Sequence, residues 1–313
     1  MSDPSDHSVD EQPRGSVSDS FRSGFVSLVG RPNVGKSTLV NRLVGAKVAI
    51  VSDRPQTTRT QIRGVRTTPT SQLVLLDTPG IHKPRTLLGE RTNDRARSTL
   101  AEVDVVCLLI EATSTIGAGD KFVARLVQAV DTPKVLVVSK TDLVSVATVG
   151  EHLSAAVAEL GEFDAYVPLS SKTGDGVDAL LGELEARLPE GPEYYPGGVV
   201  SDQPETFLVA ELVREKLLRI ARDELPHSIT VVAEELEPER DDDVLRYEVK
   251  VLVERDSQKG MVIGKGGEVI REAGTLARQE LEALLGAHVH LDTKVKVERD
   301  WQRRAHSLDR LGY

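Results

Sequence analysis

The sequence has few of the residues that define several protein classes. Cys107 is the one cysteine in 313 residues, which excludes an intramolecular disulfide and a zinc cluster built on cysteines. Cys107 lies in the apolar run 103–110, so we expect a packed strand residue and not a nucleophile. No apolar stretch approaches the roughly 18 residues that cross a membrane. Residues 1–21 lack an apolar core, so they are no signal peptide and are predicted to form a disordered tail.

Basic residues are outnumbered by acidic ones, 39 to 49, which gives a formal charge of −10. This surplus argues against a histone-like protein that coats nucleic acid regardless of sequence, although it is compatible with a local basic face. Charged residues make up 28% and hydrophobic residues 39%, the mixture of an ordinary globular protein. At roughly 150 residues per domain, the chain length predicts two domains.

The first part of the chain, residues 22–188, alternates short apolar runs with segments of helical spacing. Helices are predicted there at 88–100 and 121–130, among others, and strands at 25–29, 73–76, 103–110, 135–138 and 165–169. Strands that alternate with helices are typical of an α/β fold with a mostly parallel sheet and helices on both faces. Such a sheet binds ligands at the carboxyl ends of its strands.

A linker and a second, smaller domain follow. Residues 189–204 contain four prolines and three glycines, and we expect this linker to separate the sites of the two domains. Residues 205–313 predict an α+β domain in the order helix, strand, strand, helix, helix, strand. Its longer elements are predicted at 207–222, 228–234, 245–254, 268–285 and 289–297.

Residues Gly30–Ser37 (GRPNVGKS) match the phosphate-binding pattern G-x-x-x-x-G-K-[ST]. The match directly follows a predicted strand and precedes a predicted helix at 38–44, which is the context that the pattern requires. Its glycines let backbone N–H groups point at phosphates, and the helix N-terminus adds its positive end. We expect Lys36 to reach the β- and γ-phosphates and Ser37 to bind Mg²⁺.

Three shorter motifs follow in order at predicted strand ends. Asp77-Thr78-Pro79-Gly80 provides a carboxylate for the Mg²⁺ shell and a glycine N–H for the γ-phosphate. Ser139-Lys140-Thr141-Asp142 provides an aspartate that can accept from N1–H and N2–H₂ of guanine, which adenine does not present. Ser170-Ser171-Lys172 can close over the base. The four motifs together predict a GTP site.

The second domain contains the sequence Gly264-Lys265-Gly266-Gly267 between a short predicted helix and a long one. Helix–GxxG–helix is the clamp by which KH domains hold about four nucleotides of single-stranded RNA. The order of the strands resembles the type II KH arrangement. We expect RNA contacts from Lys259, Gly264, Lys265, Gly266, Gly267 and Arg271.

With these motifs, the chain resembles the translation-factor-related class of bacterial GTPases, and the pairing of its two domains resembles the Era family. The resemblance covers roughly residues 22–313. It implies that switch I contains Pro55-Gln56-Thr57-Thr58-Arg59, with Thr58 as the Mg²⁺ ligand and Thr57 as the runner-up. The resemblance implies catalytic roles for Lys36, Thr58, Gly80 and Asn33. It also implies that Mg²⁺ is bound by Ser37, by Thr58 and, through water, by Asp77. The expected GTP contacts are Gly30, Arg31, Pro32, Asn33, Val34, Gly35, Lys36, Ser37, Asp77, Thr78, Pro79, Gly80, Ile81, Ser139, Lys140, Thr141, Asp142, Ser170, Ser171 and Lys172.

Three residues at this site refine the expectation. Ile81 stands where many regulatory GTPases have a glutamine that orients the attacking water, so we expect slow hydrolysis without a partner. Ser139 stands where asparagine is usual, and a serine is too short for contacts to both the base and the phosphate loop. Asn33 is where related GTPases hold K⁺, although it is also compatible with a purely structural role in the turn.

The resemblance implies a cytoplasmic GTP-hydrolysing switch that binds the 3′ end of small-subunit ribosomal RNA during 30S assembly. We expect GTP, GDP, small-subunit rRNA and the 30S subunit as partners, no DNA, and a monomer. A peripheral contact at the inner face of the cell membrane stays open as a further location. The alternative is a membrane-peripheral signalling GTPase whose second domain docks to protein or lipid. A tRNA-modification GTPase lacks support, because no further catalytic group is visible. His288 and His290 lack a third ligand nearby, so we expect no metal there, and Trp301 is predicted to be a packing anchor.

Overall fold

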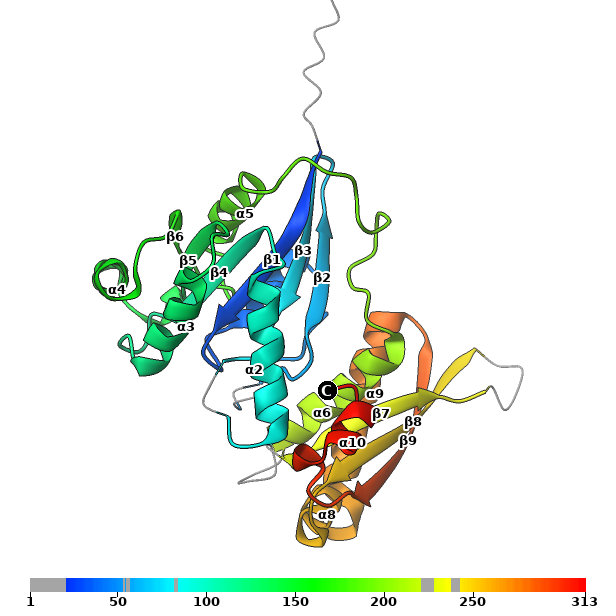
Figure 1. Ribbon diagram of the computed structural model, residues 1–313. Coiled ribbons are helices and arrows are strands. Elements are labelled where there is room, and N and C mark those ends of the chain that lie inside the picture. Colours follow the sequence, from blue (N-terminus) through cyan, green and yellow to red (C-terminus); the bar gives the residue numbers. More distant parts are fainter. Residues whose placement is uncertain (1–20, 53, 55–56, 82–83, 221–227, 238–242) are drawn as a thin grey trace, which may run out of the picture.

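The computed structural model describes residues 21–313 except 53, 55–56, 82–83, 221–227 and 238–242. Almost all of the predicted tail lies outside the described residues, as do Pro55 and Gln56 of the predicted switch I element. Two separate sheets organise the remainder (Figure 1).

The first sheet has six strands in the order β2-β3-β1-β4-β5-β6. Four neighbouring pairs are parallel, and β2 runs antiparallel to β3 at one edge. The predicted α/β fold with a mostly parallel sheet is therefore confirmed, while β2 was not predicted. The strands are β1 (Arg22–Gly30), β2 (Ile62–Thr67), β3 (Ser71–Asp77), β4 (Val105–Glu111), β5 (Lys134–Ser139) and β6 (Ala165–Pro168).

Helices cover both faces of this sheet. Apolar side chains of α1 and α5 pack against one face, and those of α2, α3 and α4 pack against the other. Cys107 points into the first of these cores and is 1% exposed, which confirms its role as a packed strand residue. The helices are α1 (Lys36–Val44), α2 (Leu87–Leu100), α3 (Ala118–Gln128), α4 (Val146–Leu160) and α5 (Val177–Glu185).

The second sheet has three strands in the order β7-β8-β9, of which β7 and β8 are antiparallel and β8 and β9 parallel. Helices α6 and α9 bury their apolar faces against it in one core. The predicted order of helices and strands is confirmed. The elements are α6 (Glu205–Ile220), β7 (Thr230–Glu235), β8 (Val244–Val253), α8 (Asp256–Ile263), α9 (Glu268–Leu285), β9 (His288–Val297) and α10 (Ala305–Arg310), with short 3₁₀ turns η2 (Lys265–Gly267) and η3 (Trp301–Arg303).

Trp301 anchors the C-terminal segment. Its side chain is fully buried, its Nε1 donates to the carbonyl oxygen of Ser228 at 3.1 Å, and it packs with Leu88 of α2. Trp301 is therefore the packing anchor that the sequence predicted, and it joins the second domain to a helix of the first.

The two domains contact each other directly, while no described residue of 205–313 lines the cavity at the phosphate loop. The linker follows the free edge of β2, where Val65 N–H donates to the carbonyl of Val200 at 2.9 Å (Figure 1). The linker therefore leads the chain along the first domain to the start of α6. Helix α6 packs against the segment around Ile50. Composition revealed a linker but not the surface on which it lies.

Candidate functional site

The phosphate loop joins β1 to α1. Lys36 is only 5% exposed, and its Nζ donates to the carbonyl oxygens of Gly30 at 3.2 Å and Arg31 at 2.9 Å. Burial lowers the pKa of Lys36 to about 8, although the charge of Asp77 opposes the shift. Gly35 precedes α1 at φ 101° and has no side chain to cap the first helical N–H groups. These groups are free to bind an anion.

Three oxygen ligands converge beside Lys36. Ser37 Oγ donates to Asp77 Oδ2 at 2.6 Å, and Thr58 Oγ1 lies 3.0 Å from Ser37 Oγ and 3.3 Å from Asp77 Oδ2. Asp77 is fully buried, and burial raises the pKa of its carboxyl group. Its Oδ1 atom has no hydrogen-bond partner among the described residues. The hydroxyl oxygens of Ser37 and Thr58 and the buried carboxylate of Asp77, which has one unpartnered oxygen, fit Mg²⁺, because Mg²⁺ prefers oxygen ligands and adds positive charge.

The neighbouring threonine points elsewhere. Thr57 Oγ1 donates to the carbonyl oxygen of Arg54 at 2.6 Å instead of meeting Ser37. The geometry therefore favours Thr58 over Thr57 as a metal ligand.

The Asp77–Gly80 motif lies against the phosphate loop. Thr78 Oγ1 donates to the carbonyl of Leu28 at 2.8 Å, and Gly80 packs so closely on Pro32 that an added Cβ would lie 2.7 Å from the Pro32 nitrogen. Ile81 is 2% exposed in the core beneath α2 and α3. Its side chain neither faces the pocket nor could orient water.

The predicted base-reading loop follows β5. Ser139 Oγ lies 2.7 Å from the carbonyl oxygen of Val34 and 3.0 Å from that of Ile110, and its single hydrogen serves one of them at a time. The serine therefore keeps the contact to the phosphate loop and has no donor left for a base.

Asp142 and Ser170 meet at the far side of this loop. Ser170 Oγ is fully buried and donates to Asp142 Oδ1 at 2.7 Å, while Asp142 itself is exposed. Thr141 N–H donates to the carbonyl of Leu169 at 3.3 Å, which joins the two loops. The structure thus brings the Ser139–Asp142 and Ser170–Lys172 motifs together.

Sequence reasoning missed Glu111 at the end of β4. Its carboxylate accepts from Lys140 Nζ and from Ser114 Oγ at 3.0 Å, and it lies 3.8 Å from Arg31 of the phosphate loop. Burial alone would raise the pKa of Glu111, but the bond to Lys140, the charges of Lys140 and Arg31 and the bond from Ser114 together lower it. The available signal was positional, because Glu111 ends a strand just as Asp77 and Ser139 do.

One cavity of about 380 Å³ is lined by the phosphate loop, Gly80, Glu111, Lys140 and parts of the segment 50–58. The predicted contacts Ile81, Asp142 and Ser170–Lys172 do not line it. The cavity lies at the carboxyl ends of β1 and β5, where a parallel sheet binds its ligand.

The glycine cluster of the second domain is exposed at Lys265 and Gly266 and half-buried at Gly264 and Gly267. Gly264, Gly266 and Gly267 have φ values of 74°, 61° and 79°, in the left-handed region that glycine adopts without strain. Around Gly266 there is open space, since an added Cβ would meet nothing within 4 Å. Arg271 donates to the Gly266 carbonyl at 3.2 Å, and Lys265 is exposed, while Lys259 on α8 is partly buried. His288 is exposed and lies 3.8 Å from Glu282, and no group of three metal-ligating side chains occurs among the described residues.

Comparison with known proteins agrees with this geometry. Residues 25–140 match the family of 50S ribosome-binding GTPases, and residues 224–302 match the KH domain family. GTPase Era of Mycobacterium avium (strain 104) is 51% identical over 94% of this chain and 99% of its own length. GTPase Era of Mycobacterium tuberculosis is 52% identical over the same shares.

Two solved structures resemble the whole chain, each covering 94% of it and 99% of its own length. One is Era in complex with MgGDPNP and nucleotides 1506–1542 of 16S ribosomal RNA, with a TM-score of 0.91 and 35% identity. The other is an Aquifex aeolicus Era variant bound to GDP and AlF4⁻, with a TM-score of 0.90 and 36% identity. The chain belongs to the Era family of GTPases.

Proposed function

We propose that this chain binds and hydrolyses GTP at the cavity around Lys36 and couples this cycle to small-subunit ribosomal RNA. The observation that carries the proposal is the convergence of Ser37, Thr58 and Asp77 beside Lys36, together with an exposed Asp142 at the base-reading position. The proposed GTP-binding set is the one named from the sequence, with Glu111 added as the partner of Lys140.

In this proposal the phosphate loop binds and orients the nucleotide. Lys36 turns from its two carbonyl acceptors toward the β- and γ-phosphates. We propose that Gly80 N–H donates to the γ-phosphate. Ser37 and Thr58, and Asp77 through a water, would hold Mg²⁺, which would supply charge stabilisation to the phosphoryl transition state. Ile81 orients no water, so we expect slow turnover until a partner or a cation completes the site.

K⁺ is the proposed cation, and Asn33 its ligand. Asn33 lines the cavity and holds a φ of 66°, which turns the loop toward the position of the phosphates. A monovalent cation there would add positive charge where negative charge develops.

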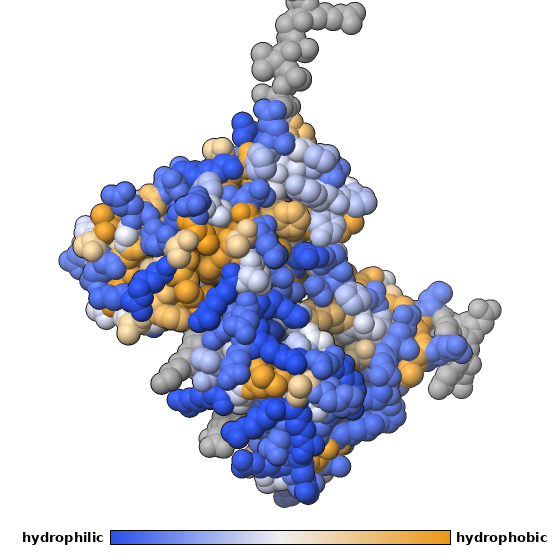
Figure 2. Space-filling model, in the orientation of Figure 1, coloured by the Kyte–Doolittle hydropathy of each residue, from blue (hydrophilic) through white to orange (hydrophobic). Residues whose placement is uncertain are grey.

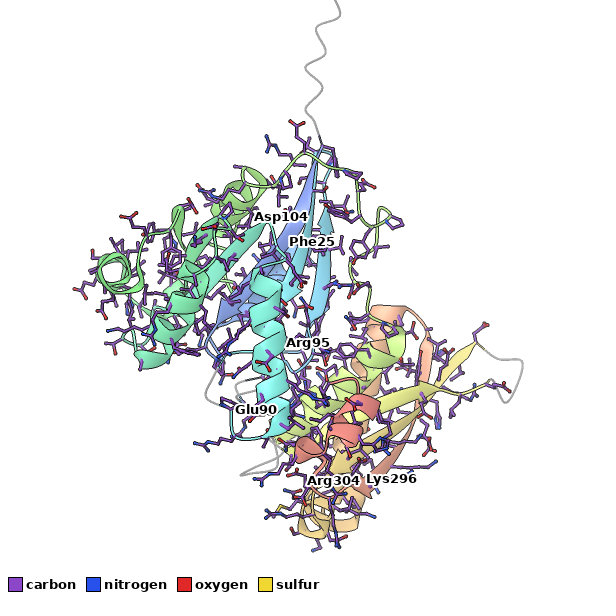
Figure 3. All side chains as sticks on the ribbon, viewed as in Figure 1. Phe25, Glu90, Arg95, Asp104, Lys296 and Arg304 are labelled. Atoms are coloured by element: carbon purple, nitrogen blue, oxygen red, sulfur yellow. The ribbon has the colours of Figure 1, made fainter. Side chains whose placement is uncertain are left out.

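For the second domain we propose RNA binding through the exposed glycine cluster. The related Era structure holds nucleotides 1506–1542 of 16S ribosomal RNA, and we infer that this chain binds the corresponding 3′ end during 30S assembly. The open space at Gly266 lets a sugar-phosphate backbone approach, and basic side chains such as Lys296 and Arg304 lie on the same domain (Figure 3). We propose domains at 22–188 and 205–313, joined by the linker 189–204.

We further propose a cytoplasmic monomer, with membrane docking as the rival. Among the described residues, no helix is both long and apolar enough to span a bilayer. On the face shown in Figure 2, hydrophilic residues cover most of the second domain, which leaves a lipid surface little apolar area to bind.

RNA crosslinking and footprinting test the proposal. The purified protein is incubated with small ribosomal subunits in the presence of GDP or GDPNP, and crosslinks are mapped on both molecules. We expect protein crosslinks at Gly264–Gly267 and RNA protection at the 3′ end. Crosslinks elsewhere on the protein, together with flotation on anionic vesicles, would favour membrane docking.

A further inference from the structure

The second domain contacts the predicted switch I segment on both sides of Thr58. Ile50 is 1% exposed and packs into the core of the second domain, and the Val51 N–H donates to Glu215 Oε1 of α6 at 2.9 Å. The chain is thus held by the second domain at residues 50–51, ahead of the predicted switch I element.

Arg214 of α6 makes the contact nearest to Thr58. Its Nη2 donates to the backbone carbonyl oxygen of Thr57, the residue directly before Thr58. The Arg214 side chain is 1% exposed and also donates from Nε and Nη2 to Glu211 at 2.6 Å. A buried guanidinium that loses an acceptor carries a large desolvation penalty, so this contact is strongly favoured.

Arg59, the residue directly after Thr58, is also held by the second domain. Its Nη1 donates to the carbonyl oxygen of Ile229 at 2.7 Å, and its guanidinium lies over the ring of Trp301 at 5.5 Å from the centroid. Both chain neighbours of Thr58 are therefore held by the second domain, while Thr58 Oγ1 lies 3.0 Å from Ser37 Oγ.

We propose that Arg214 is a positioning residue for GTP hydrolysis, which acts by holding the Thr57 carbonyl so that Thr58 faces the magnesium position. This inference rests on the proposed role of Thr58. Switch I contacts Mg²⁺ and the γ-phosphate in the GTP state and releases them after hydrolysis. Arg214 therefore acts on the GTP state and not on GDP, because it lowers the cost of ordering Thr58 around the transition state.

The proposal differs from a purely structural role for the Arg214–Glu211 pair. A structural role would lower stability and weaken GTP and GDP binding alike. A positioning role lowers kcat and raises the Mg²⁺ concentration needed by the GDPNP complex, while GDP affinity stays within about twofold. The Mg²⁺ requirement separates the two roles.

The experiment uses the full chain with Arg214→Met and Arg214→Lys. Both variants remove the guanidinium, and the lysine keeps the positive charge. Both should lower kcat about tenfold and raise the Mg²⁺ requirement of the GDPNP complex about fivefold, measured by titration with a fluorescent analogue. Lys47→Met is the matched control, because Lys47 bonds Glu215 and Glu280 across the same interface without touching the Thr57 carbonyl. It should change both quantities less than twofold.

A double-mutant cycle with Thr58→Ala completes the test. Because Arg214 acts through Thr58, Arg214→Met should add less than twofold to the Thr58→Ala defect. If Thr58→Ala leaves the Mg²⁺ requirement unchanged, the proposed ligand is wrong. If Thr58→Ala raises it but Arg214→Met does not, the positioning role alone fails. Should Arg214→Met not fold, Glu211→Gln is the substitute, because it keeps the arginine but weakens its ion pair. It should give a smaller defect of the same kind. The absence of any defect in Glu211→Gln would refute the proposal.

Discussion

Two glycine-containing loops of this molecule bind phosphates in the proposed function, and the protein shapes them in different ways. In the nucleotide site, a Cβ on Gly30 would lie 2.6 Å from the carbonyl oxygen of Leu109, and one on Gly80 would lie 2.7 Å from the Pro32 nitrogen. In the second domain, a Cβ on Gly266 would meet nothing within 4 Å.

The difference holds position by position: protein backbone encloses Gly30 and Gly80, whereas Gly266 leaves space that a ligand can fill. Within the same two loops, Gly35 also has open space, and a Cβ on Gly264 would lie 2.6 Å from Val269 Cγ2. A side chain at Gly30 or Gly80 disturbs the fold and the chemistry together. A side chain at Gly266 would displace the ligand. Its cost to the protein itself is the backbone strain of a non-glycine residue at φ 61°. The following predictions test this contrast.

The largest expected effect is on base recognition in the packed site. Asp142→Asn should weaken GTP binding by at least roughly 100-fold, because a site built to hydrogen-bond one group rejects its analogue strongly. Xanthosine nucleotides should gain affinity, since their position 2 is an acceptor. Competition binding with GDP and XDP measures the switch, with Asp178→Asn on α5 as the control. A mutant that still prefers GDP would refute the assignment of Asp142.

The next effect concerns the open cluster. Gly266→Asp should reduce affinity for a 3′-end RNA by about tenfold or more, because its carboxylate occupies and repels the backbone position. GTP hydrolysis without RNA should hardly change. Fluorescence anisotropy across a salt series measures the loss, and we expect a shallow salt slope for the unmutated protein because few basic residues lie near the cluster.

Gly150→Asp adds the same charge in the first domain, where a Cβ also has open space. It should leave RNA affinity within about twofold. Unchanged RNA binding by a folded Gly266→Asp protein, checked by circular dichroism, would remove the KH assignment.

A smaller effect is expected from the cation. Turnover should be several-fold faster in K⁺ than in Na⁺, and Asn33→Ala should abolish the difference. The variant also places alanine at φ 66°, so its melting temperature is recorded alongside steady-state rates in both salts. Equal rates of the unmutated protein in the two salts would leave Asn33 with only a turn-forming role.

The smallest effect is expected at Ser139. Because its hydroxyl is occupied by the carbonyls of Val34 and Ile110, Ser139→Asn should add a donor for the nucleotide and slow GDP release by about two- to fivefold. Stopped-flow release of a labelled GDP measures it. Unchanged release would mean that the packed surroundings already supply what the asparagine offers.

Sequence alone predicted most of the fold, because apolar runs and helical spacing report burial within one domain. Helix α9 was predicted at the residues where it occurs, 268–285. Strand β2 escaped prediction because Arg63, Gly64 and Arg66 interrupt its short apolar pattern at the sheet edge.

The candidate site followed the same rule. The structure gathers the phosphate loop, Gly80 and Lys140 around one cavity and bonds Ser170 to Asp142, while their roles toward a nucleotide stay predictions. The sequence did not predict the contacts between the domains. Arg214 and Glu215 read as ordinary helix charges, yet both are buried by the first domain. Such burial depends on how two separately folded units meet, which no local pattern encodes.

The linker on the edge of β2 limits how far the domains can travel. Ser201 Oγ bonds the Arg63 carbonyl at 2.8 Å, Asp202 pairs with Arg63, and α6 begins at Glu205. The intervening chain of about three residues spans at most roughly 10 Å. While the linker stays on β2, the first turn of α6 therefore cannot move more than roughly this distance from the edge of the first sheet.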